Sequence, residues 1–219
     1  MAAAVPLSID VVSDVVCPWC FIGKRRLEAA IASAPDVPVA VRWRPFLLDP
    51  SIPPGGLDRQ EYMRQKFGDR DLAASHDRLT EMGRAEGAPY RFDLIKRSPN
   101  TIDAHRVVRW ASEAGHEDAM VERLFTDYFV NGRDVGNHEI LADAAESVGL
   151  DRTTTLRRLS TPYDRAAVEA EIAAAQRIGV TGVPCFIIGN KYGVVGAQTA
   201  DILAGAIRKA AEERAVAPA

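Results

Sequence analysis

The N-terminal part of the chain alternates between runs typical of buried strands and a stretch with helical spacing. Leu7–Ser13 is rich in β-branched residues and predicts a buried strand. Val39–Phe46 alternates apolar and basic residues, which predicts a half-buried strand. Between these runs, apolar residues from Pro18 to about Ala34 recur on one helical face. This order of strand, helix and strand is typical of two parallel strands joined by a crossover helix.

The middle of the chain shows almost no strand pattern. Helical spacing predicts successive helices over 58–67, 72–87, 101–114, 117–130, 138–148 and 152–159, and a longer one over Pro162–Arg177. Strand patterns return at Pro184–Gly189 and Tyr192–Gly196, which we expect to form a hairpin. A closing helix is predicted over Thr199–Arg214, followed by a disordered tail over Ala215–Ala219. We therefore predict an α/β fold in which an all-helical insertion interrupts a central β-sheet.

The composition is that of an ordinary globular protein. The 219 residues include 27 Lys and Arg against 30 Asp and Glu, a formal net charge of −3, and 47 % hydrophobic residues. The mild acidic balance argues against nucleic-acid binding, which needs clustered positive charge. Since no run of about 18 apolar residues occurs, we expect no membrane span. Before Cys17 there is no Lys or Arg and polar residues interrupt the apolar run, so we predict no secretory leader and a cytoplasmic location.

The three cysteines, Cys17, Cys20 and Cys185, are too few for a disulfide scaffold. In the cytosol, a CxxC pair is more often redox-active or metal-binding than structural. The motif CPWC follows the first predicted strand directly and places Pro18 at the first helical position. Cys17 therefore lies at the positive end of a helix, where a thiolate is favoured over a thiol. Cys20 lies one turn further along the same side, within reach of the Cys17 sulfur, and we expect it to be more buried.

This spacing predicts that Cys17 attacks a disulfide and that Cys20 resolves the resulting mixed disulfide. Trp19, between them, is expected to tune the redox equilibrium. A zinc site would need four ligands, and no second CxxC or HxxxH accompanies the three cysteines, so we expect no metal. A site built from these cysteines and one histidine is left open.

A second motif, Gly182–Val183–Pro184–Cys185, stands at the start of a later strand. A proline is tolerated there because it need not donate to the ladder. Placed against the CxxC pair, it would leave the backbone of Val183 free to pair with an extended substrate segment.

The strand, CPWC and helix, followed much later by TGVPCFIIGNKYGVVGAQ and a closing helix, resemble the thioredoxin fold of the DsbA family, and the helical block resembles its insertion. Further matches to the cytosolic FrnE-like branch are Pro99–Thr101, Asp103–Arg106, Tyr128–Phe129 with Gly132–Asp134, and Gly196–Gln198. The resemblance spans about Leu7 to Arg208. It implies that Cys17 is the nucleophile, Cys20 the resolving thiol and Pro184 a cis-proline. It also implies a thioredoxin-like domain of residues 1–54 and 162–219, with a helical insertion domain over 55–161.

Several further side chains are candidates for the site, each with a structural alternative. Asp14 could accept a proton during thiol exchange or cap a turn. Asn100, Thr101 and His105 match insertion residues that can face a substrate cleft, or they are helix caps and an ordinary histidine. Cys185 stands where the branch usually has an aromatic or aliphatic residue. It either forms an alternative disulfide or packs as a small hydrophobe.

We predict a cytosolic thiol–disulfide oxidoreductase acting on protein or small-molecule disulfides, with no tightly bound cofactor and with glutathione as a candidate cosubstrate. Its expected partners are thiol- or disulfide-containing proteins, and a homodimer is left open. The alternative is a glutathione-dependent isomerase or transferase, similar to 2-hydroxychromene-2-carboxylate isomerases and kappa-class glutathione transferases. Those relatives usually have serine in place of Cys17 and lack the second cysteine. A binding module without catalysis is the third alternative. The Lys24–Arg26 run is expected to be a solvated helix face.

Overall fold

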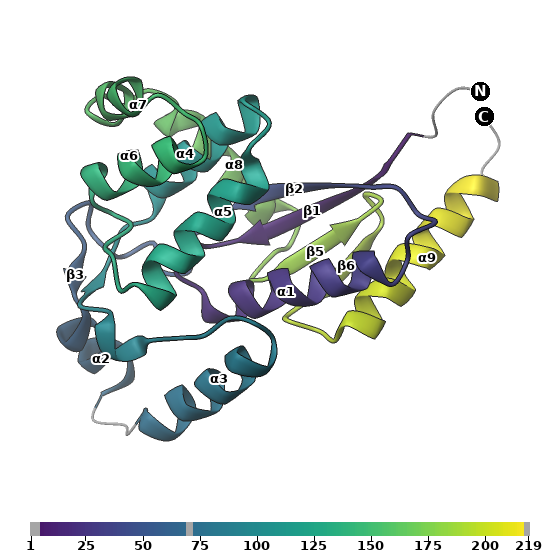
Figure 1. The fold of residues 1–219 in the computed structure, drawn as a ribbon, viewed down its shortest axis with the longest axis horizontal. Coiled ribbons are helices and arrows are strands. Elements are labelled where there is room, and N and C mark those ends of the chain that lie inside the picture. Colours follow the sequence, from purple (N-terminus) through teal and green to yellow (C-terminus); the bar gives the residue numbers. More distant parts are fainter. Residues whose placement is uncertain (1–4, 69–71, 217–219) are drawn as a thin grey trace.

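The computed structural model describes residues 5–68 and 72–216 (Figure 1). Its elements are β1 (Leu7–Ser13), α1 (Pro18–Ala32), β2 (Val39–Pro45), β3 (Leu57–Asp58), α2 (Arg59–Phe67), α3 (Ala73–Ala85), the 3₁₀ turn η1 (Phe92–Leu94), β4 (Arg97–Ser98), α4 (Ile102–Glu113), α5 (Glu117–Phe125), the π-helical segment η2 (Thr126–Val130), α6 (His138–Ser147), α7 (Arg152–Leu159), α8 (Arg165–Arg177), β5 (Cys185–Ile188), β6 (Tyr192–Val195) and α9 (Ala200–Val216). None of the helices in this described part is long and apolar enough to cross a membrane.

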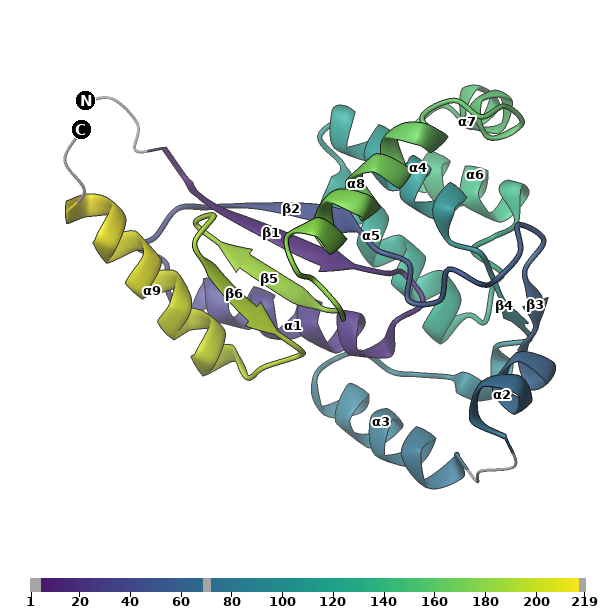
Figure 2. The ribbon, with the colours of Figure 1, turned by 180° about the vertical axis from the view of Figure 1, so that it is seen from behind.

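The central sheet has the strand order β2-β1-β5-β6. β1 pairs in parallel with β2, and it pairs antiparallel with β5, which forms the predicted hairpin with β6. α1 and α9 pack against each other, whereas α8 contacts β2 on the side turned to the viewer in Figure 2. The predicted α/β fold with its β–α–β start is confirmed, and the sheet brings the segment before β5 next to the end of β1.

The alternation of apolar and basic residues in β2 has a specific electrostatic partner. Asp10 on β1 accepts hydrogen bonds from Arg42, at 3.0 Å, and from Arg44, at 2.9 Å. Trp43 between them turns to the core and is only 6 % exposed. The half-buried strand predicted from this pattern therefore has one apolar face and one face of ion pairs.

Some element boundaries differ from the sequence-based expectation. α8 begins at Arg165 rather than Pro162, because Asp164 takes a left-handed conformation with φ 60° and separates the preceding turn from the helix. β3 and β4 form a two-stranded sheet that was not predicted, since two residues are too few to show an alternating pattern. α9 continues to Val216, so the tail expected after Arg214 is wrong at 215–216, and its remaining residues lie outside the described part.

An aromatic cluster joins α1 to the predicted insertion. Phe21 stacks on Phe125 at 5.1 Å and on Phe129 at 6.1 Å, and it meets the edge of Tyr90 at 6.0 Å. All four side chains are at least 97 % buried. The helix that carries the cysteine pair thus shares one core with the helical block, and the boundaries predicted for two separate domains stay a prediction.

The Lys24–Arg26 run is not the solvated face that its charge suggests. Lys24 is 2 % exposed and lies 2.9 Å from Asp118, which also accepts a hydrogen bond from the Trp43 indole at 3.1 Å. Burial opposes the charge of Lys24, yet Glu28 and Asp118 hold its pKa above the usual value. This correction shows that Lys24 ties α1 to α5 and β2 through a buried cation.

Candidate active site

The CPWC motif forms the start of α1 as predicted. Cys17 is the N-cap residue, with an extended backbone (φ −88°, ψ 115°), and Pro18 follows at the first helical position. A turn places it there, since the Cys17 N–H donates to the Asp14 carbonyl at 3.0 Å and the Cys20 N–H donates to the Cys17 carbonyl at 3.0 Å. The first turn carries no acidic side chain, so nothing in it offsets the positive end of the helix dipole at the sulfur.

Both thiols of the motif are free and buried. Cys17 is 2 % exposed and Cys20 is 1 % exposed, so the predicted difference in burial between them is negligible. The Cys17 Sγ donates a weak hydrogen bond to the Val183 carbonyl at 3.7 Å, and it also hydrogen-bonds with the Cys20 side chain. The two sulfurs therefore share one site, as the spacing predicts.

The surroundings of Cys20 keep its thiol protonated. Burial is the largest cause that raises its pKa, and the hydrogen bond and charge of Cys17 raise it further. The Ser13 hydroxyl and the backbone of Asp14 act in the opposite direction without offsetting burial. Any reaction that needs a Cys20 thiolate must therefore remove a proton from a dry site.

We expect a step in which Cys20 acts as nucleophile to accelerate as the pH rises. Below the raised pKa of Cys20 the thiolate fraction grows about tenfold per pH unit, and the thiolate is the reacting form. Stopped-flow measurement of the second product released from a preformed Cys17 mixed disulfide, across neutral and alkaline pH, checks this. A release rate that does not change with pH would contradict it.

The second motif meets the first at the cysteine pair. The Val183–Pro184 peptide bond is cis, as the resemblance implies, and the Pro184 carbonyl accepts the Gly196 N–H at 2.8 Å. Gly23 on α1 allows this approach, since a Cβ at that position would lie 3.0 Å from the Cγ of Pro184. Val183 is half-buried beside the Cys17 sulfur.

Asp14 and His105 meet at the end of β1. Asp14 is 1 % exposed, and its Oδ2 accepts the Leu48 N–H at 2.7 Å. Its Oδ1 lies 3.5 Å from His105 Nε2, which is 3.0 Å from the Phe46 carbonyl oxygen. Asp14 thus both shapes the turn before Cys17 and offers a buried carboxylate. Its role as proton acceptor stays a prediction.

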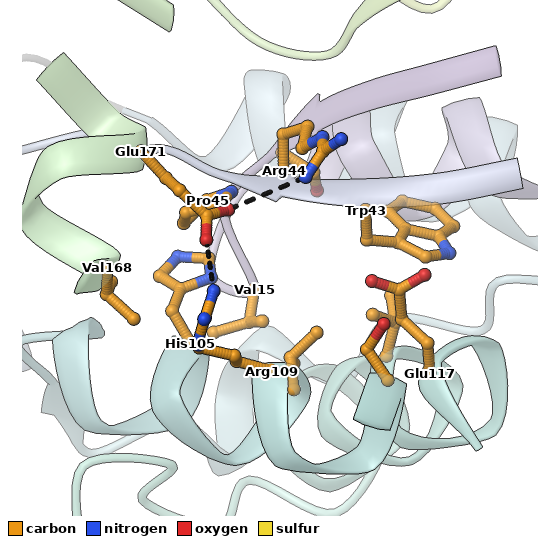
Figure 3. A pocket seen from close by; sticks show the side chains of 13 residues that line it. Val15, Trp43, Arg44, Pro45, His105, Arg109, Glu117, Val168 and Glu171 are labelled. Carbon is orange, nitrogen blue, oxygen red and sulfur yellow. Dashed lines mark hydrogen bonds and ion pairs between the residues drawn. The ribbon is translucent and has the colours of Figure 1, made fainter. Parts of the chain in front are cut away.

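His105 lines a small cavity beneath β2, shown in Figure 3. Its volume is about 70 Å³, and Ser13 and Glu117 also line it. At its rim Glu171 lies 2.5 Å from Arg109 and 3.7 Å from Arg44. Burial raises the pKa of Glu117. A cavity of this size holds a few water molecules but no substrate.

A larger pocket of about 380 Å³ lies beside the motif. Val16 and Pro18, the chain neighbours of Cys17, line it together with Asp14 and Thr101. Its far wall consists of α2 and α3. We call it the α2–α3 pocket. It adjoins the cysteine pair and has the size of a small-molecule site.

The remaining predicted substrate-binding residues are spread around the site. Trp19 is 41 % exposed beside the cysteines. Asn100 instead joins two backbone segments, donating to the Ile52 carbonyl at 2.8 Å and accepting the Ile102 N–H at 3.1 Å. Thr101 thus lines the α2–α3 pocket, His105 lines the smaller cavity, and Asn100 lines neither. Their roles toward a substrate stay predictions.

Cys185 lies on β5 directly after the cis-proline. It is 5 % exposed and packs in an apolar cluster with Val12 and Phe46. Burial raises the pKa of its thiol. These surroundings fit a small buried hydrophobe, and Cys185 is a free thiol in this structure. Within the described ranges, no group of three or more His, Cys, Asp and Glu side chains is arranged to hold a metal ion.

A family model, the DSBA-like thioredoxin domain, matches residues 8–208. The chain belongs to this family. A probable DsbA oxidoreductase, SCO1869 from Streptomyces coelicolor, has a structure similar to this DSBA-like chain, with a TM-score of 0.89 and 32 % identity. The match covers 97 % of this chain and 92 % of that one. The predicted family and thioredoxin-like fold are thereby confirmed.

More distant structures share the DSBA-like fold. A 2-hydroxychromene-2-carboxylate isomerase matches with a TM-score of 0.68 and 15 % identity over 97 % of this chain and all of that one. The cytosolic disulfide reductase DsbM from Pseudomonas aeruginosa with GSH matches with a TM-score of 0.60 and 17 % identity over 95 % of this chain and 98 % of that one. At these identities the likeness concerns the fold alone.

Three residues of this DSBA-like site were missed by the sequence interpretation. The Tyr90 hydroxyl donates to the Pro18 carbonyl at 2.5 Å, and burial raises the pKa of Tyr90. The Ser13 hydroxyl lies near the Cys20 thiol and opposes the rise of its pKa. Gly23 leaves space for the close approach of the Pro184 ring. Gly23 could have been noticed from the sequence, because a glycine inside a predicted helix often marks a close packing contact. Tyr90 had no local signal, since it is distant in sequence from the cysteines.

Proposed function

We propose that this DSBA-like protein is a cytosolic thiol–disulfide oxidoreductase in which Cys17 attacks and Cys20 resolves. The observation that carries the proposal is the contact between two free thiols at the start of α1, against the cis Val183–Pro184 segment. The Cys17 sulfur lies at the N-terminal end of α1, where the helix dipole is positive, while burial retains the proton on Cys20. The two thiols are thereby suited to different steps.

The exchange proceeds in two balanced steps. The Cys17 thiolate attacks one sulfur of a substrate disulfide, the substrate S–S bond breaks, and the other sulfur leaves as a thiolate. Cys20 then loses its proton and attacks Cys17, which releases the second substrate thiolate and forms the Cys17–Cys20 disulfide. The substrate gains two electrons and the protein loses two. Asp14 is our candidate for the proton acceptor, because its Oδ1 is buried and, within the described structure, has no hydrogen-bond partner.

The proposal includes polypeptide substrates and glutathione. An extended segment would pair with the backbone of Val183, and Trp19 in the CPWC motif is exposed for contact with it. Glutathione is proposed as a cosubstrate that reduces the Cys17–Cys20 disulfide, a role that the fold shared with a reductase described with GSH supports. No tightly bound cofactor is proposed. The fold shared with an isomerase favours glutathione-dependent isomerisation as the second candidate.

The test of the proposed function is the reduction of insulin by dithiothreitol with and without the protein. We expect the wild-type protein to accelerate insulin precipitation well above the uncatalysed rate. A rate equal to the uncatalysed one would overturn the proposal. Turnover of a chromene-type substrate that depends on added glutathione would instead support the isomerase.

Cys185→Ala is expected to retain insulin reduction within about twofold of the wild type. The raised pKa and the apolar surroundings of Cys185 keep its thiol protonated and unreactive. The same assay and a thermal melt check this, because loss of the sulfur leaves a small cavity that lowers stability by about 1 kcal/mol. A large loss of activity with unchanged stability would assign Cys185 to the redox cycle.

A further inference from the structure

We propose that the α2–α3 pocket binds a small disulfide with an apolar, aromatic body and an acidic group, and that Arg59 is the partner of the acid. The inference rests on the proposed function, which supplies the thiolate that reacts with the disulfide. It goes further by naming the class of substrate and the residue that selects it.

Part of the apolar lining of the pocket lies on two helices that bury few of their own residues. α2 contains no fully buried residue, and in α3 the buried residue is Gly83. Met63, Phe67 and Leu79 of these helices line the pocket while remaining half-exposed. Contact with an apolar ligand would remove their exposed apolar surface from water, which is energetically favourable. A volume of about 380 Å³ suits a small molecule rather than a folded surface.

Aromatic rings form part of the same wall. Phe92 and Phe129 line the pocket, and their ring centroids lie 6.2 Å apart at nearly a right angle. His76 stacks on Phe92 at 4.6 Å. Burial, and then the charge of Arg59, lower the pKa of His76, so this ring is neutral at neutral pH. The wall thus offers uncharged aromatic surface, in which Phe92 is half-buried, for contact with an aromatic ligand.

Arg59 is a positively charged residue in the lining of the pocket. Its Nη1 lies 3.4 Å from the Tyr128 hydroxyl, and no carboxylate of the described residues lies within ion-pair distance of it. Burial raises the pKa of Tyr128 to about 12 even though the charge of Arg59 opposes this, so the phenol stays neutral. A guanidinium that pairs with none of the described carboxylates, in a partly apolar pocket, matches a carboxylate or sulfonate on a ligand.

The other charges in the pocket fix the orientation of such a ligand. Lys66 is already paired with Asp49 at 2.9 Å, and Tyr62 donates to the same carboxylate at 3.0 Å. Asp14 lines the pocket as well, as does Pro18, and its carboxylate would repel an anion. The acid therefore belongs at Arg59, which leaves the disulfide end toward Pro18 and the Cys17 sulfur. The exchange then follows the two steps given above, with two small thiolates as products.

Binding is tested with anilinonaphthalene sulfonate, an aromatic anion, and with N-phenylnaphthylamine, which lacks the sulfonate. We expect saturable binding of the anion by the wild-type protein and by Cys17→Ser, so failure of the redox proposal would not affect this result. Arg59→Gln should weaken the anion about tenfold relative to the neutral probe, and Arg59→Lys should recover part of the loss. Arg78→Gln is the matched control, since exposed Arg78 on α3 does not line the pocket.

Substrate selection is tested with two aromatic disulfides, the anionic dithiobis(nitrobenzoate) and the neutral dithiodipyridine. The ratio of their kcat/KM values should fall about tenfold in Arg59→Gln, mainly through KM of the anion, and stay at the wild-type value in Arg78→Gln. An unchanged ratio in Arg59→Gln, an equal fall in Arg78→Gln, or anion binding that does not saturate would each overturn the proposal. Strong inhibition of anion binding by unfolded insulin at the pocket would also overturn it, in favour of a polypeptide.

Discussion

Replacing Cys17 with serine is expected to abolish disulfide exchange, whereas replacing Cys20 with serine is expected to leave the protein covalently joined to its substrate. A serine hydroxyl does not ionise near neutral pH, so the first attack should slow by at least about a thousandfold. In Cys20→Ser that attack still occurs. Its mixed disulfide then persists, because the side chain in contact with the Cys17 sulfur is no longer a thiol.

Insulin reduction and intact-protein mass spectrometry check these two outcomes. Both variants should lose catalytic turnover, and only Cys20→Ser should gain the mass of one substrate half, which dithiothreitol removes. Serine is close in size to cysteine, so thermal melts near that of the wild type serve as the folding control. Full insulin reduction by Cys17→Ser, or an adduct on Cys17→Ser instead of Cys20→Ser, would contradict the assigned order of attack.

Arg106→Met is expected to destabilise the protein by about 3–5 kcal/mol, which lowers the midpoint of thermal unfolding by roughly 10 °C. Arg106 is 1 % exposed and donates to the carbonyls of Arg158, Thr161 and Tyr163 at 2.6–2.7 Å. It also lies 2.8 Å from Asp103. Methionine fills a similar volume but leaves these carbonyls, at the end of α7 and in the following turn, without their donor.

Arg109→Met is the matched control on the same helix. Arg109 is 36 % exposed and pairs with Glu171, so its loss should cost no more than about 1 kcal/mol. Urea denaturation of both variants and the wild type measures the difference. Equal stability of Arg106→Met and Arg109→Met would contradict the role given to the Arg106 guanidinium.

Local sequence patterns were sufficient where an element is decided by its own residues. The β-branched run of Leu7–Ser13 and the helix α1, which starts at a proline, form as predicted. The residues that bury the strand and start the helix are consecutive in the sequence. The burial of Lys24 was not predictable, since it depends on Asp118, which is distant in sequence and comes close only in the folded chain. The same holds for the short β3–β4 pair, whose stability comes from its surroundings rather than from its pattern.

The residues of the site also differ in how far the sequence predicts them. Cys17, Cys20 and Pro184 belong to motifs whose spacing and flanking elements reveal their chemistry. The lining of the α2–α3 pocket has no motif, because half-exposed apolar residues and a lone arginine occur on most surface helices. Arg59 becomes informative only when the structure shows that no described carboxylate neutralises it.

The position of β1 in the sheet has a consequence for synthesis on the ribosome. β1 pairs with β2 on one side and with β5 on the other, and Val12 of β1 lies opposite Cys185. The nascent chain therefore emerges with both motif cysteines long before β5 exists to cover the second edge of β1. Until β5 has been synthesised, that edge of β1 is open to pairing with other chains, and the thiols of Cys17 and Cys20 are open to oxidation.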